Sequence, residues 1–284
     1  MTSFTVSFPD GSTLPVDIEY KTGQTPPTNK MVVHTVTLGH DRATEVNLTL
    51  TPGSVVPPPP PNPTPNAPVT VGALTFNENF ATLDSHVWAS SYFGGASVNG
   101  VTTDPANVRV AGGVCSLTLS SPSVGACIST NPQGGANPGF TFGTGYVEWA
   151  ATFPGTGPTL ESWAAVWSSS QKWPATGEID IAESLQGALT SNYHSGGPSG
   201  GSVNVPNNSG PIAGSWGGTP HTFGVHRLVN RNDVYWDGQL VRSYQTFDNA
   251  APHYLLACIG NGQGNPVTVP AVLSLSHVRV WNLA

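Results

Sequence analysis

Residues 177–184 read Gly-Glu-Ile-Asp-Ile-Ala-Glu-Ser, and they indicate a β-strand with acids on one face. The two isoleucines are β-branched and favour an extended chain. Side chains of a strand alternate between its two faces, so Glu178 and Asp180 point to the same side and Glu183 to the other. A β-bulge near residues 181–182 would return Glu183 to the side of the other two acids. We therefore predict a bulged strand with three carboxylates on one face.

These three acids are a candidate catalytic centre. The chain has 16 Asp and Glu in 284 residues, yet three of them fall within six positions, and no Lys or Arg lies nearby to neutralise them. Glycoside hydrolysis uses such a set, because one carboxylate attacks the anomeric carbon while a protonated one donates to the leaving oxygen. We predict that Glu178, Asp180 and Glu183 are catalytic. The alternative is a solvated strand face, which ordinarily carries charges of both signs.

Sequences around the acids closely resemble glycoside hydrolase family 16, in its laminarinase-like branch with a bulged Glu-x-Asp-x-x-Glu motif. The likeness is carried by Trp163-Ala-Ala-Val-Trp167 and by Trp173-Pro-Ala-Thr-Gly-Glu-Ile-Asp-Ile-Ala-Glu183. Weaker segments follow the order of the family over about residues 72–284, among them Phe76–Phe80, Gly145–Trp149, Tyr235–Gly238 and Val278–Trp281. The resemblance implies that Glu178 is the nucleophile, Glu183 the acid/base and Asp180 the assisting carboxylate.

The resemblance also implies an activity. It points to a retaining endo-glycosidase that hydrolyses a β-linked polysaccharide, above all a β-1,3- or β-1,3/1,4-glucan, by double displacement. A galactan hydrolase of the agar or carrageenan type and a transglycosylase of the same fold are alternatives. A non-catalytic glycan-binding protein is a further alternative. The acid trio argues against it, because binding alone gives no reason to keep three mutually repelling carboxylates.

Four residues are candidates for substrate binding, since sugars lay their apolar faces on aromatic rings. Trp173 stands five positions before the expected nucleophile, where a loop could hold it over a groove, and the family places a stacking Trp there. Trp163 and Trp167 share one strand parity, and one or both are expected to face the groove. His194 lies on the next expected strand and either contacts substrate or tunes the acid/base. A surface His beside a Gly-rich loop is the alternative.

Composition and turn signals indicate an all-β protein. The chain holds 33 Gly and 27 Pro, and only 9% of its residues are charged, against about 25% in ordinary globular domains. From residue 69 short strands alternate with turn residues and show no helical period, which predicts a two-sheet sandwich over residues 69–284. The family resemblance sharpens this to a concanavalin A-like β-jelly roll. Residues 54–68 form a Pro-rich linker, and residues 1–53 a small β-module of five or fewer strands with no assigned role.

Charge and hydropathy limit the partners. The net charge of −7 argues against nucleic acid, because the chain could not neutralise a run of phosphates. No apolar stretch approaches the ~18–20 residues that span a bilayer, so we expect no membrane insertion. Residues 1–11 show no basic, apolar leader, so no signal peptide is visible. We expect a monomeric protein that is secreted or surface-associated and acts on a polysaccharide.

Three cysteines are too few for a disulfide framework. Cys115 and Cys258 lie in apolar strand-like runs and are expected to be small buried hydrophobes. A bridge between Cys115 and Cys127 is conceivable.

No cofactor is expected to be required, and no catalytic metal is expected. By resemblance, many relatives hold a structural calcium with an Asp where this chain has Ser276. A calcium ion here would have to rely on backbone carbonyls together with Glu78 or Asp84.

Overall fold

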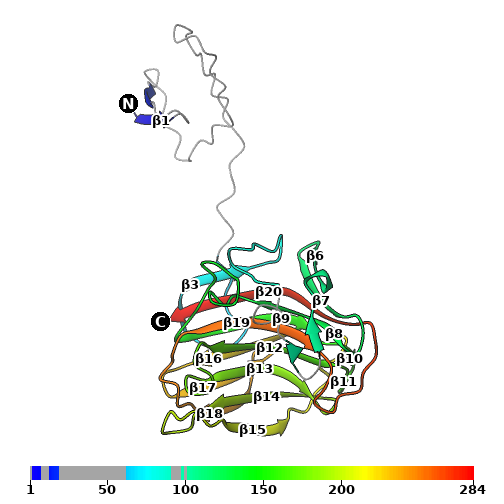
Figure 1. Ribbon diagram of the computed structural model, residues 1–284. Helices are drawn as coiled ribbons and strands as arrows, with labels where there is room; N and C mark the ends of the chain where they lie inside the picture. Colours follow the sequence, from blue (N-terminus) through cyan, green and yellow to red (C-terminus); the bar gives the residue numbers. More distant parts are fainter. Residues whose placement is uncertain (1, 8–12, 19–61, 91–96, 99–100) are drawn as a thin grey trace. The chain divides into compact units, whose positions relative to one another are not determined.

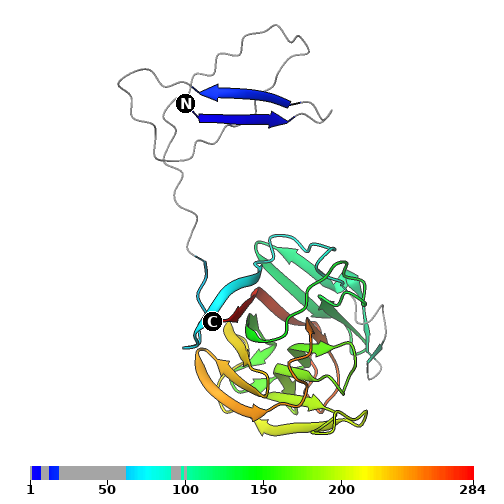
Figure 2. The same cartoon turned by 90° about the vertical axis from the view of Figure 1, so that its left-hand side faces the viewer.

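The computed structural model describes residues 2–7, 13–18, 62–90, 97–98 and 101–284. The chain divides into two compact units, residues 1–61 and 62–284. In the first unit the described residues form one antiparallel pair, β1 (Thr2–Ser7) and β2 (Thr13–Ile18), drawn in blue in Figure 2. The other strands expected within residues 1–53, and the linker up to residue 61, lie outside the described residues.

Two large, largely antiparallel sheets make up the second unit (Figure 1). We call one the site sheet; its strands are, in spatial order, β15 (Val205–Pro211), β14 (Ala188–Ser195), β13 (Glu178–Leu185), β12 (Trp163–Ser170), β19 (His253–Gly260), β8 (Val124–Ser129), β5 (Val101–Thr103) and β4 (Ser97–Val98). We call the other the back sheet; its order is β18 (Gln239–Gln245), β17 (Arg231–Trp236), β16 (His221–Arg227), β9 (Gly145–Thr152), β20 (Ala271–Leu283), β7 (Val114–Leu119) and β6 (Val108–Ala111), with β3 (Val71–Glu78) paired to β20.

Small elements connect these sheets. The strands β10 (Gly155–Thr156) and β11 (Thr159–Leu160) form a two-stranded pair, and η1 (Pro105–Asn107) is a single 3₁₀ turn. The described residues contain no α-helix, and within them no helix is long and apolar enough to cross a membrane.

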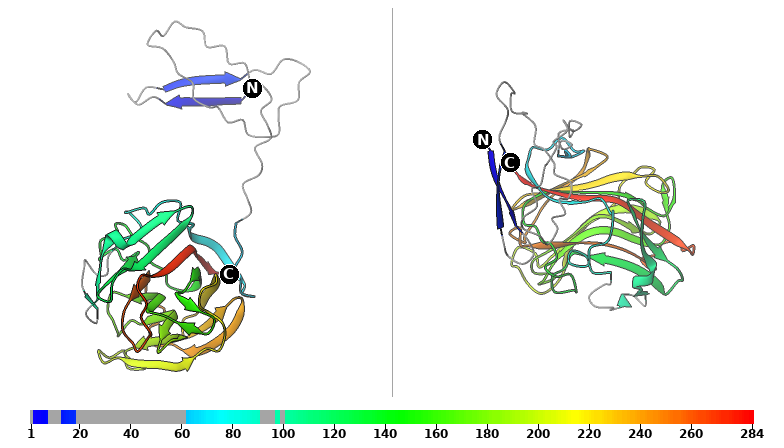
Figure 3. Two further views of the ribbon diagram at one scale, coloured as in Figure 1. Left: turned by 90° about the vertical axis from the view of Figure 1, so that its right-hand side faces the viewer. Right: turned by 90° about the horizontal axis from the view of Figure 1, so that it is seen from above.

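The two sheets lie face to face and enclose one hydrophobic core (Figure 3). Val166 and Ile179 of the site sheet belong to the same buried cluster as Trp149 and Trp236 of the back sheet, and all four are fully buried. The indole of Trp236 also donates to the carbonyl of Ile181 at 3.0 Å, which satisfies its N–H inside the core. The predicted all-β sandwich of the jelly-roll type is therefore confirmed.

A β-bulge interrupts β13, as its sequence predicts. Against β14, Asp180 pairs with Asn192 and Glu183 with Thr190, so that three steps on β13 face two on β14. The register with β12 shifts at the same place. Residues 181–182 are both fully buried in the core cluster, although neighbours on a regular strand would face opposite sides. The bulge brings Glu183 back to the face that carries Asp180.

Residues 62–67 pack onto the back sheet, although the sequence suggests a linker there. The backbone N–H of Asn66 donates to the buried carboxylate of Glu148 at 2.7 Å, and the indole of Trp281 donates to the carbonyl of Pro63 at 3.1 Å. Ala67 is buried beside Trp281. The second unit therefore begins at residue 62.

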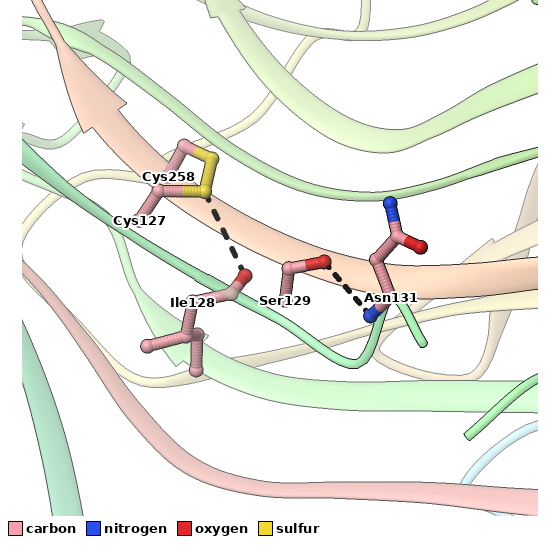
Figure 4. Close-up of a disulfide and its surroundings, with 5 residues drawn as sticks. All are labelled: Cys127, Ile128, Ser129, Asn131 and Cys258. Atoms are coloured by element: carbon pink, nitrogen blue, oxygen red, sulfur yellow. Dashed lines mark hydrogen bonds between the residues drawn. A yellow bond between two sulfur atoms is a disulfide. The ribbon is translucent and has the colours of Figure 1, made fainter. Parts of the chain in front are cut away.

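The cysteine pairing differs from expectation. Cys127 of β8 and Cys258 of β19 are directly opposite each other in register and form a disulfide, with their Cα atoms 4.1 Å apart (Figure 4). Cys115 is free and buried, as predicted, so it cannot be the partner of Cys127. The interpretation of Cys258 as an unpaired hydrophobe was wrong, because the partner strand is 131 residues away in sequence and only the sheet order brings it alongside.

Candidate active site

One pocket of about 450 Å³ opens over the site sheet. Its walls come from four strands and from the loop between β12 and β13. The lining residues are Val101, Thr103, Trp163, Ala165, Trp167, Ser169, Trp173, Glu178, Asp180, Glu183, Cys258, Ile259 and Gly260. The volume lies within the ~300–1,000 Å³ range of small-molecule sites.

The three predicted acids lie together in this pocket. Glu178 and Asp180 face it because they share one parity of β13, and Glu183 joins them because of the bulge. Asp180 and Glu183 are buried among their neighbours, while Glu178 is partly exposed. Among the described residues that line the pocket there is no Lys or Arg, so none of these neutralises the negative charges.

Glu183 is held by two donors. The indole N–H of Trp163 donates to Oε1 at 2.8 Å, and the side-chain amide of Asn192 donates to Oε2 at 2.8 Å. Burial raises the pKa of Glu183 to about 7, and the charge of Asp180 adds to the rise, while the two hydrogen bonds oppose it. Both oxygens of the carboxyl are thus fixed in place, and its proton is gained or lost near neutral pH.

Glu178 lies at the start of β13 with Ser169 of β12 opposite. Burial raises the pKa of Glu178 to about 8; the charge of Asp180 raises it further, and a hydrogen bond from Ser169 and the charge of His194 lower it. Acidity alone therefore does not separate the roles of the two glutamates. Both sit in surroundings that favour the protonated form more than water does.

His194 contacts Asp180 rather than lining the pocket. Its Nε2 lies 3.3 Å from Oδ2 of Asp180, and its Nδ1 lies 2.9 Å from the side-chain amide of Asn204. Although burial acts in the opposite direction, the hydrogen bond and the negative charges of Asp180, Glu178 and Glu183 raise the pKa of His194 to about 9. At neutral pH the imidazolium is the cation of this cluster, and it offsets part of the repulsion among the carboxylates.

The three predicted tryptophans all line the pocket, in different ways. Trp173 is 52% exposed, so its ring is available to a ligand. Trp163 is half-buried and holds Glu183 through its N–H. Trp167 is half-buried and packs against Cys127, Tyr254 and Leu256. Only Trp173 therefore combines a large exposed face with a position beside the acids.

The acids Glu178 and Asp180 and the imidazole of His194 each offer one ligand atom, all within 4.8 Å of one another. This set suits a divalent cation in outline. However, the hydrogen bond to Asp180 and the neighbouring negative charges raise the pKa of His194, so a metal would have to displace a proton from the ring to bind there. Glu78, which the sequence offers as a ligand for a structural calcium, accepts hydrogen bonds from the N–H of Phe80 and the indole of Trp88 at 2.6 and 3.0 Å. Both of its carboxylate oxygens therefore have hydrogen-bond partners within the protein.

Several residues that line the pocket or hold its acids were not found from the sequence. Asn192, which donates to Glu183, lies on β14 and carries no motif. Val101 and Thr103 of β5 reach the pocket because β5 joins the site sheet through a parallel pairing with β8. Cys258 lies in the same cross-strand row as Ala165 and Glu183, which brings the disulfide to the pocket floor. For Asn192 the sequence offered one indication: alternation along β14 places it on the same face as His194.

Comparison with known proteins supports the architecture. No protein-family model matches the chain, and no curated protein matches it in sequence. Solved structures do match it, and they include laminarinases and endo-glucanases, one of them assigned to glycoside hydrolase family 16.

Three of these structures illustrate the likeness. A laminarinase from Flavobacterium sp. UMI-01 has a TM-score of 0.59 at 19% identity, covering 74% of this chain and 100% of that chain. An endo-β-1,3-glucanase from Pyrococcus furiosus has a TM-score of 0.58 at 18% identity, covering 78% and 99%. A mutant of a non-specific endo-β-1,3(4)-glucanase from family 16, co-crystallised with 1,3-β-D-cellobiosyl-cellobiose, has a TM-score of 0.60 at 18% identity, covering 76% and 98%. The chain therefore has a glycoside hydrolase family 16-like fold.

Proposed function

We propose that this protein is a retaining endo-glycosidase that hydrolyses a neutral β-linked glucan, with β-1,3- or β-1,3/1,4-linkages. The observation that carries the proposal is the convergence of Glu178, Asp180 and Glu183, from one bulged strand, on one pocket that also holds an exposed Trp. A strand without the bulge would bury Glu183 in the core or displace it from the other acids. The unfavourable grouping of carboxylates is explained if the pocket performs acid/base and nucleophilic chemistry.

In the proposed mechanism Glu178 attacks the anomeric carbon while Glu183 gives its proton to the glycosidic oxygen, which leaves with the rest of the chain. Water then attacks the anomeric carbon from the side that the leaving oxygen vacated, opposite Glu178; the ester bond to Glu178 breaks, and the ionised Glu183 takes a proton from that water. The sugar is released and both glutamates return to their first states. Trp163 and Asn192 keep the carboxyl of Glu183 oriented through both steps.

Asp180 and His194 both act on the protonation of the two glutamates. The charge of Asp180 favours a proton on Glu178 and on Glu183, while the imidazolium of His194 favours the ionised form of each. The assignment of the nucleophile to Glu178 follows the family resemblance. We assign His194 to charge compensation at Asp180, on the basis of their 3.3 Å contact.

The charge of the pocket favours a neutral glycan. A sulfated galactan would bring anionic groups beside three acids, and none of the described lining residues is a Lys or Arg that could pair with them. The β-glucanases among the similar structures support the same choice. Trp173 supplies the stacking platform, and Trp163 and Trp167 form further parts of the wall.

The remaining parts of the proposal concern the whole chain. The second unit, residues 62–284, would be the catalytic domain, and the Pro-rich residues before it, from residue 54, would link it to the module of residues 1–53. We propose that the protein acts outside the cell or on a surface, where polysaccharide is found, and that it acts as a monomer.

A substrate panel tests this function. The full chain is incubated with laminarin, lichenan, agarose and κ-carrageenan, and new reducing ends and product lengths are measured. We expect laminarin or lichenan to be cut into oligosaccharides of mixed length from the first minutes, and carrageenan to be left intact because it is anionic. Cleavage of carrageenan or agarose alone would contradict the glucan assignment. Tight binding of a glycan with no release of sugar from any of the four would support a binding protein instead.

A further inference from the structure

The imidazole of His253 lies fully buried beneath the loop that carries Trp173. His253 is the first residue of β19, and its Nε2 is 2.8 Å from the carbonyl oxygen of Thr176. Its Nδ1 is 3.1 Å from the hydroxyl of Ser168. A carbonyl oxygen only accepts hydrogen bonds, so Nε2 carries the proton and Nδ1 accepts from Ser168.

His253 stays neutral in these surroundings. Burial and the nearby positive charge of Arg227 lower its pKa well below the usual 6.5. The carboxylate of Asp248 lies 3.7 Å from Nε2, but it pairs with the guanidinium of Arg227 at 3.1 Å. The single ring proton of His253 is therefore committed to the carbonyl of Thr176.

Thr176 fixes the loop of residues 171–177 at the end nearest to β13. Its hydroxyl is 2.6 Å from that of Ser170, and its N–H donates to the carbonyl of Lys172 at 3.0 Å. The other end of the loop is tied through Gln171, whose side chain donates to Asn131 at 2.6 Å. Asn131 in turn donates its backbone N–H to the hydroxyl of Ser129, beside the disulfide in Figure 4.

The loop closes tightly at Gly177. This residue has a φ of +86°, and a Cβ atom there would lie 2.5 Å from the carboxylate of Asp248. The Arg227–Asp248 pair thus packs against the loop from below, next to His253. The buried polar groups form one support under residues 176–177.

Trp173 and Glu178 depend on this support to different degrees. Glu178 is held in the ladder of the site sheet, opposite Ser169 on one side and His194 on the other. Trp173 lies in the loop, outside the ladder, where it lines the pocket. A loosened loop should therefore disturb Trp173 more than Glu178.

We propose that His253 is a positioning residue, which holds the Trp173 loop in its sugar-binding form by donating from Nε2 to the carbonyl of Thr176. This inference rests on the proposed function insofar as Trp173 is a sugar platform. The order of the loop itself can be tested without any substrate.

Two substitutions at His253 distinguish the hydrogen bond of Nε2 from that of Nδ1. His253→Gln keeps an N–H near the position of Nε2, whereas His253→Asn keeps an amide near Nδ1 but does not reach Thr176. Ser168→Ala is the matched control, because it removes the partner of Nδ1 and leaves the bond to Thr176. If His253→Asn does not fold, the double variant His253→Leu with Ser168→Ala serves instead, since it removes both buried polar groups together.

The first readout is hydrogen exchange of the backbone amides of residues 171–173 and 175–177 in the free protein. We expect faster exchange of the loop in His253→Asn, or in the double variant, while the strands β12 and β13 keep their protection. The variants His253→Gln and Ser168→Ala should exchange like the parent. Unchanged loop exchange in His253→Asn, or equal losses in the Asn and Gln variants, would overturn the proposal. This readout remains valid even if the parent cleaves no glycan.

The second readout is the split between KM and kcat on the preferred glucan. We expect His253→Asn to raise KM by about tenfold, the order expected for loss of an aromatic platform, with kcat within about twofold of the parent. In a Trp173→Ala background the same substitution should change KM little, because its effect passes through Trp173. A fall in kcat with an unchanged KM, or full additivity with Trp173→Ala, would contradict the role proposed for His253.

Discussion

Glu178→Gln should abolish hydrolysis of the glucan while leaving the glucan bound. The amide cannot form the glycosyl ester, so we expect turnover to fall by about 10⁴-fold or more. The shape of the pocket and the exposed face of Trp173 stay, so binding measured by calorimetry or affinity electrophoresis should remain near that of the parent. Glu161→Gln, which lies outside the pocket lining, is the control and should keep full activity.

The same variant should make the fold more stable at alkaline pH. Burial raises the pKa of Glu178 to about 8, so between pH 4.5 and 8 the unfolded chain releases this proton while the folded protein keeps it. The free energy of unfolding therefore falls as pH rises through this window, and glutamine removes the loss. We expect Glu178→Gln to be about 1–2 kcal/mol more stable than the parent at pH 8–9 and equal to it near pH 4. Thermal unfolding at both pH values measures this, and a less stable variant at pH 9 would show that the carboxylate is not penalised there.

Glu183→Ala should lose activity in a way that depends on the leaving group. Natural glucan needs a proton on the departing oxygen, so we expect its hydrolysis to slow by about 10³–10⁴-fold. A dinitrophenyl β-glycoside needs no such proton, and formation of the glycosyl-enzyme should be almost unaffected. Burial and the charge of Asp180 raise the pKa of Glu183, so the parent should lose activity toward alkaline pH as Glu183 gives up its proton, and this loss should disappear in the variant.

Azide then assigns the two roles. In Glu183→Ala it can replace water in the second step, and we expect the β-glycosyl azide with a restored rate. In Glu178→Ala it can enter the space of the missing nucleophile and attack directly, which gives the α-glycosyl azide. Nuclear magnetic resonance distinguishes the two products. The opposite pairing of variant and anomer would exchange the roles of Glu178 and Glu183.

The sequence carried enough information for the fold and the centre of the site. Alternation along residues 178–183 predicted both the strand and its bulge. Two of the acids fall on one face of a regular strand, and the third reaches that face only if a bulge intervenes. The tryptophans before the acids could also be predicted as neighbours of the acids, because they lie close to them in sequence as well as in space. Local periodicity was sufficient wherever the partners belong to one hairpin.

Features that depend on the order of strands in the sheets could not be predicted. Cys127 and Cys258 meet because β8 lies beside β19, and this neighbourhood leaves no periodic trace in the sequence. Val101 joins the pocket through the parallel pairing of β5 with β8. His253 reaches Thr176 from a strand 77 residues further along the chain. The contacts beneath the pocket are long-range, whereas its three acids lie close together in sequence.

The anomeric configuration of the first product tests the central claim most directly. The parent is mixed with laminarin or lichenan, whichever it cleaves, and the anomeric protons are followed by nuclear magnetic resonance before mutarotation. Double displacement through Glu178 predicts that the β-anomer appears first and the α-anomer only later, as the sugar equilibrates. Initial appearance of the α-anomer would mean a single inverting displacement, and it would contradict the nucleophilic role of Glu178.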